Sequence, residues 1–154
     1  MRAIILALTL MAEPVLAEDL PGGFVLGTSW DQAQAHAAAQ GWAVTKDEFA
    51  PDQWYVSEAE VTLSVCEGRI VQLSRHFKGD MTDFLDEVDD LTLPYGQPSV
   101  HAVQQEVFGA VLRTTLAEFP VVDRLVVIAS LSSVEGIKQI SVIYRQGETC
   151  TFTE

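Results

Sequence analysis

Hydrophobic and polar residues alternate along much of this chain, and that two-residue period predicts a fold dominated by strands. The alternating segments are rich in β-branched and aromatic residues and are separated by Gly-containing turns, as half-buried strands are. We expect strands over residues 53–57, 60–66, 69–77, 124–131 and 137–144, with a short edge strand over residues 24–26. Residues 111–119 fit either a strand or a helix, and their branched residues with Thr114-Thr115 favour a strand. Residues 125–128 are apolar without alternation, which indicates a strand buried on both faces.

The hairpin around Gly68 allows its register to be predicted. A three-residue loop, Cys66 to Gly68, would place Leu63 on the face that carries Leu73, whereas a two-residue loop would mix apolar and polar faces. We therefore predict the three-residue loop. The opposite face of this hairpin is then polar and solvated, and it carries Thr62, Ser64, Gln72, Ser74 and His76.

A helical period replaces the alternation in three places. Residues 29–32 (Ser-Trp-Asp-Gln) have the form of a capping box, and the Ala-rich run behind them ends at Gly41. An apolar stripe at helical spacing predicts a second helix over residues 80–91, ended by the Pro-rich segment 94–98. Ser99 could cap a third helix carrying Val100, Val103 and Val107.

The predicted elements define an α+β domain over residues 18–154: an antiparallel sheet of about five to seven strands with two or three helices packed on one face. The turn at Glu67-Gly68 resembles the turn at Glu135-Gly136, as expected for a duplicated helix-plus-meander unit or for two similar hairpins that arose by chance. The helix-plus-meander organisation, with Gly27-Thr28-Ser29 opening the first helix, is similar to that of exported β-lactamase-inhibitor-like modules. The resemblance is one of organisation and assigns no site residues.

Residues 1–17 have the parts of a cleaved signal peptide. One basic residue precedes a short apolar run, and Val15 and Ala17 occupy the −3 and −1 positions before Glu18. About ten apolar residues are too few to cross a hydrocarbon core of about 30 Å. We therefore expect an exported, periplasmic or secreted domain with no stable membrane anchor after cleavage.

The net charge narrows the classes of partner, and the cysteine content indicates a disulfide. With 22 acidic and 9 basic residues the net charge is −13, which disfavours nucleic acid and favours a basic protein or cations, unless the charge serves solubility alone. In an oxidising compartment Cys66 and Cys150 are candidates for a disulfide.

Acidic residues crowd the second predicted helix, where two interpretations compete. Helical spacing places four of them away from the apolar stripe, on a solvated face that could contact a partner: Asp83, Asp86, Glu87 and Asp90. The alternative is calcium binding over residues 80–90, although the spacing is not that of an EF-hand loop.

No nucleophile, phosphate-binding or metal-ligand motif is present in the sequence, so we expect no catalytic residue, metal or cofactor. Trp54 and Tyr55 are consecutive in a strand and point to opposite faces, which makes one of them a candidate anchor for a partner. The leading hypothesis is a non-enzymatic exported module that binds a protein or an envelope component. The alternative is a small exported hydrolase with a carboxylate-based site, for which Glu58 and Glu60 are dispersed candidates.

Overall fold

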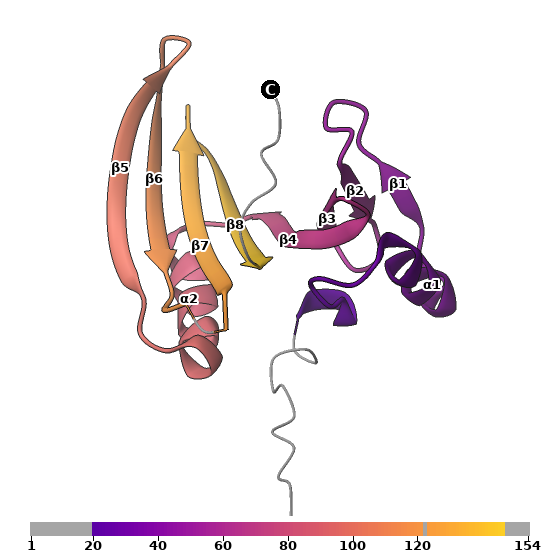
Figure 1. Cartoon of the computed structure of the whole chain (residues 1–154). Coiled ribbons are helices and arrows are strands. Elements are labelled where there is room, and N and C mark those ends of the chain that lie inside the picture. Colours follow the sequence, from indigo (N-terminus) through magenta and orange to yellow (C-terminus); the bar gives the residue numbers. More distant parts are fainter. Residues whose placement is uncertain (1–19, 122, 147–154) are drawn as a thin grey trace, which may run out of the picture.

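The computed structural model describes residues 20–121 and 123–146, so the predicted signal peptide lies outside the described residues. This part of the chain forms eight strands, two α-helices and one short 3-10 helix (Figure 1). In chain order they are η1 (Pro21–Gly23), α1 (Trp30–Gln40), β1 (Val44–Lys46), β2 (Gln53–Val56), β3 (Val61–Cys66), β4 (Arg69–Lys78), α2 (Met81–Tyr95), β5 (Ser99–Val107), β6 (Ala110–Glu118), β7 (Leu125–Val134) and β8 (Ile137–Gln146). The α+β class is confirmed, but eight strands exceed the predicted five to seven.

All eight strands belong to one antiparallel sheet with the order β1-β2-β3-β4-β8-β7-β6-β5. Each half of the sheet is a four-strand meander preceded by a helix, and the halves meet where β4 pairs with β8, from Gln72↔Arg145 to Lys78↔Gln139. Counted from either edge to the centre, each half contributes its four strands in chain order. The two halves are therefore related by an approximate two-fold axis at the β4–β8 pair.

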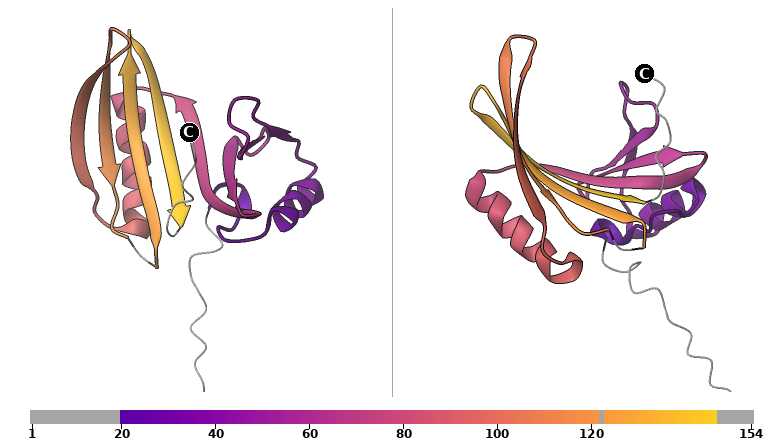
Figure 2. Two further views of the ribbon diagram at one scale, coloured as in Figure 1. Left: turned by 45° about the horizontal axis from the view of Figure 1, so that its top comes forward. Right: turned by 60° about the vertical axis from the view of Figure 1, so that its left-hand side comes forward.

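The core lies between one face of the sheet and the two helices. Figure 2 shows α1 and α2 on the same side of the sheet, with the outer hairpins rising on the other side. The strand residues that alternate toward the helices are buried, and they include Val56, Leu63, Leu73, Val127, Ala129, Leu131, Ile140, Val142 and Tyr144. Residues 125–128 are buried on the helix side only, so the prediction that both faces of this strand are buried was wrong.

Helix α1 forms as the sequence predicts. The Ser29 hydroxyl accepts a hydrogen bond from the Gln32 backbone N–H at 3.3 Å, and Gly41 ends the helix with a left-handed φ of 74°. Its first residue, Trp30, stacks on Trp54 of β2 with ring centroids 4.5 Å apart. This contact fixes the helix against the first half of the sheet.

Helix α2 is longer than predicted. Asp80 caps its first turn by accepting hydrogen bonds from the backbone N–H groups of Thr82 and Asp83, and Phe84 and Leu91 are buried against the sheet. The helix continues through Pro94 to Tyr95 instead of ending near residue 91. Pro94 lacks the N–H that would bond to the carbonyl of Asp90, and because it lies in the last turn this loss is confined to the end of the helix.

The β3–β4 hairpin corrects the predicted loop. Cys66 pairs with Arg69, so the loop has the two residues Glu67 and Gly68 instead of three. A bulge after Ser64 shifts the register, Val71 becomes the extra residue, and Leu63 still lies opposite Leu73. The assignment of faces was therefore right although the loop length was wrong.

Two further predicted elements are wrong. The proposed third helix is strand β5, which pairs with β6 along its whole length, from Ser99↔Glu118 to Val107↔Ala110. Its valines recur at helical spacing, but Val100 and Val103 lie on opposite faces of a strand, and pairing with β6 decides the conformation. Residues 24–26 form no strand; Phe24 is buried beside Trp42 instead.

Two equivalent turns join the last strands of each half. Glu67 and Glu135 have φ values of 48° and 49°, and each is followed by a glycine with positive φ, which is the type I′ turn of a two-residue hairpin. The repeated order of helix and four strands, together with these turns, favours duplication over chance as the explanation of the sequence echo.

We predict that Glu135→Asn stabilises the domain. Asn adopts the left-handed conformation at lower cost than Glu, so the free energy of unfolding should rise by roughly 0.5–1 kcal/mol. Chemical denaturation measures the change. Glu106→Asn makes the same charge change within a strand and should give no gain; equal gains in both variants would contradict the turn assignment.

Candidate functional site

The open face is the side of the sheet that points away from α1 and α2. The strand register brings hydroxyl side chains together across its centre, from β3 to β6: Thr62, Ser64, Ser74, Ser130, Ser132, Ser141 and Thr114. The predicted polar face of the β3–β4 hairpin is part of it. Ser64 and Ser74 are nevertheless only 1% and 3% exposed, so the face is less solvated there than predicted.

His76 lies at the centre of the open face between two serines. Its Nδ1 atom is 2.8 Å from the Ser141 hydroxyl, and its Nε2 atom is 3.1 Å from the Ser74 hydroxyl. Partial desolvation lowers the pKa of His76 below its ordinary value of 6.5. The imidazole is therefore neutral at neutral pH and bridges β4 and β8.

This arrangement suits hydrogen bonding better than catalysis. The described partners of both His76 nitrogens are hydroxyls, whereas a catalytic serine–histidine pair needs a third group, usually a carboxylate, to orient the imidazole. Thr114 and Ser132 form another hydroxyl pair at 3.2 Å. The open face thus presents donors and acceptors to an approaching surface.

Two aromatic side chains stand on loops that rise beside the open face. Phe49, in the β1–β2 loop, is 96% exposed, and Asp47 holds its loop by accepting hydrogen bonds from the backbone N–H groups of Phe49 and Ala50 at 2.7 and 3.1 Å. Phe108 is fully exposed at the β5–β6 turn with φ of 50°. Figure 2 shows both loops on the side away from the helices.

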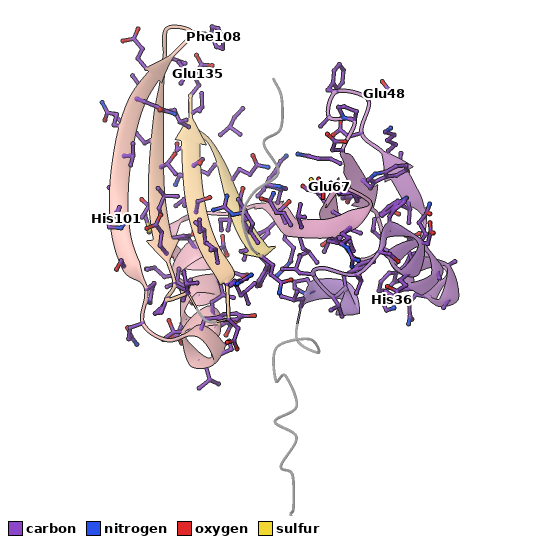
Figure 3. All side chains as sticks on the ribbon, in the orientation of Figure 1. His36, Glu48, Glu67, His101, Phe108 and Glu135 are labelled. Atoms are coloured by element: carbon purple, nitrogen blue, oxygen red, sulfur yellow. The ribbon has the colours of Figure 1, made fainter. Side chains whose placement is uncertain are left out.

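Acidic residues lie near both Phe49 and Phe108. Asp47, Glu48 and Asp52 belong to the loop of Phe49 and are exposed. Figure 3 shows Phe108 and Glu135 at the same end of the sheet and Glu48 on the opposite loop. Exposed aromatic rings are strong protein-binding anchors, and the acids around them complement a basic surface. Sequence reasoning missed both tips, although isolated aromatics beside turn residues were visible.

Trp54 and Tyr55, the two predicted aromatic anchors, lie on opposite faces of the sheet. Trp54 lies on the helix side, where it stacks on Trp30 and lies under the Lys46 ammonium, 5.4 Å from the ring centroid. Tyr55 lies on the open face and is 46% exposed. Tyr55 therefore remains available to a partner, while Trp54 belongs to the packing of α1.

The four acidic residues that were predicted to form one solvated face of α2 have different roles in the structure. Asp83 completes the capping box of α2, and Glu87 lies 3.5 Å from Arg75 of β4. Asp86 and Asp90 are exposed on the helix side, away from the open face. Backbone hydrogen bonds from Thr82 and Asp83 lower the pKa of Asp80. Within residues 20–121 and 123–146, no group of three or more potential ligands could hold a metal ion.

Glu58, a candidate for a carboxylate-based site, closes a turn. It accepts hydrogen bonds from the Ser57 hydroxyl at 2.6 Å and the Ala43 backbone N–H at 2.9 Å, and these bonds lower its pKa. A general acid requires the opposite shift. Glu60 is exposed at a positive φ of 52° in the same connection.

Only one cysteine of the predicted disulfide is among the described residues. Cys66 ends β3 on the side of the open face and is not a free thiol. Cys150 lies outside the described residues, so the pairing of Cys66 with Cys150 stays a prediction.

No protein family matches the chain, and no curated protein or solved structure is similar enough to match it. In the part of the chain that the structure describes, no helix has both the length and the apolar character needed to span a membrane. The class that the fold defines is an α+β domain built on one eight-stranded antiparallel sheet.

We predict that His76 makes the domain less stable in mild acid. Its pKa is lower in the folded than in the unfolded chain, so protonation favours unfolding once the pH falls through the unfolded value of 6.5. Thermal unfolding from about pH 7 to about pH 5 should show a larger loss for the wild type than for His76→Gln. Equal losses would contradict this role of His76.

Proposed function

We propose that this protein is a non-enzymatic exported module that binds a basic protein partner through its open face. The observation that carries the proposal is the pair of exposed phenylalanines, Phe49 and Phe108, on loops that rise at either side of a sheet face without helices. Between them the face offers hydroxyl groups, His76 and the exposed ring of Tyr55.

Hydrogen bonds hold the backbone of the loop that carries Phe49 and of the hairpin that carries Phe108. Asp47 holds the Phe49 loop through two hydrogen bonds, and the Phe108 turn closes a hairpin that is paired over nine positions. A loop whose backbone is already ordered loses less conformational entropy on binding than a flexible one.

Charge supports the choice of a basic partner. The net charge is −13, and acids flank both aromatic tips. A field of this kind accelerates the approach of a positively charged partner and weakens as salt increases. Binding should therefore become weaker at high ionic strength.

The test uses the exported chain, immobilised, with an extract of the compartment into which it is exported. The double variant Phe49→Ser with Phe108→Ser should lose the captured protein, because truncation of a binding anchor costs about 2 kcal/mol or more, roughly thirtyfold in Kd. Leu93→Ser is the matched control, since Leu93 is 93% exposed on α2, on the helix side. Capture that survives in the double variant would reject the open face as the site.

The proposal includes export with cleavage before Glu18 and a Cys66–Cys150 disulfide, and one mass measurement tests both. Mass spectrometry of the exported protein should give a chain that begins at Glu18 and is lighter by two hydrogens than the reduced form, as one Cys66–Cys150 bond requires. A chain that retains Met1 would contradict cleavage. Labelling of thiols without reduction would contradict the disulfide.

A further inference from the structure

The two edges of the sheet are unequal. At one edge β1 has three residues and ends with Lys46, which are devices that prevent pairing with another strand. At the other edge β5 has nine residues, contains neither Lys nor Pro, and is exposed at every position. An exposed and long edge of this kind is a template for another strand.

The hairpin geometry shows which backbone groups of β5 are unpaired within the sheet. The two-residue turn at Phe108-Gly109 makes Val107↔Ala110 a hydrogen-bonded pair, and such pairs alternate along an antiparallel ladder. The odd-numbered residues of β5 therefore bond to β6. The N–H and C=O groups of the even-numbered residues point to the free edge: Val100, Ala102, Gln104 and Glu106.

In the described part of the chain, the helix side of this edge is open as well. Helix α2 packs on β7, and beyond its first residue, Met81, a groove of about 360 Å³ opens beside β5, lined in part by Ala102, Gln104 and Leu131. Val100, Val103 and Val107 are 59%, 48% and 39% exposed. Apolar side chains and backbone groups are thus exposed along the same strand.

We propose that β5 pairs antiparallel with β5 of a second copy of this chain, which joins two eight-stranded sheets across a two-fold axis at Val103. In this register Val103 faces Val103 of the partner, and all nine residues of each strand overlap. The outward-facing residues meet as hydrogen-bonded pairs, Ala102 with the partner's Gln104 and Val100 with the partner's Glu106.

Self-complementarity favours a second copy over a foreign strand. In the Val103-centred register no like charges lie opposite each other, because Glu106 faces an apolar residue, and His101 faces the partner's Gln105. The remaining opposition comes from two net charges of −13, which salt screens.

The experiment is sedimentation velocity of the full exported chain over a range of concentrations, at low and high salt. We expect a reversible dimer that tightens at high salt, the opposite of the salt dependence of basic-partner binding. Gln104→Pro removes one outward N–H per copy but none that bonds to β6, and it should weaken the dimer about tenfold or more. Gln104→Thr keeps the N–H and is the matched control.

Two outcomes overturn the proposal: a wild type that stays monomeric at every concentration, and a folded Gln104→Pro variant that dimerises like the wild type. If that variant fails to fold, hydrogen exchange of the wild type decides, because dimerisation must protect the amides of Ala102 and Gln104 as concentration rises. The register has its own test. Val103→Cys should form an intermolecular disulfide on mild oxidation, whereas Val100→Cys, which faces Glu106 of the partner, should not. Cross-linking of both or of neither would reject it.

Discussion

The pairing of β4 with β8 is the interaction on which the rest of the structure depends. It joins two four-strand meanders that would each have an unpaired central edge, and it sets their alternation in phase, so that Leu73 lies beside Tyr144 and His76 beside Ser141. Because the phase is shared, both helices cover one face, and no helix of the described residues covers the other. A slip of one residue at this pair would invert one half of the sheet relative to the other, so that either His76 or Ser141 would face the helices.

Local sequence was sufficient to predict much of the fold. The Ser29 capping box, the Glu135-Gly136 turn and the strands that flank it depend on neighbouring residues, and all are present in the structure. The errors involve long-range pairing. Residues 99–107 have valines at helical spacing, but nine registered pairs with β6 outweigh that pattern. Residue spacing around Gly68 could not show the bulge that makes Val71 the extra residue of its hairpin.

The candidate site could be predicted less well from the sequence than the fold, because it depends on which face of the sheet each residue occupies. Tyr55 and Trp54 were indistinguishable until the position of α1 showed that Trp54 stacks on Trp30. Clustered acids drew attention to residues 80–90, where Asp80 and Asp83 in fact cap the helix. Phe49 stands in a polar loop and Phe108 in a Gly-containing turn, and only the bending of the sheet brings both tips to the same side.

The shortness of β1 has a consequence for how far the protein can assemble. A sheet that offered two long edges could add copies at both and grow into a fibre without end. Here the edge related to β5 by the internal two-fold has been reduced to three residues and closed by Lys46. Association through the long edge therefore consumes the only extended edge of each copy in the described sheet, and growth stops at two.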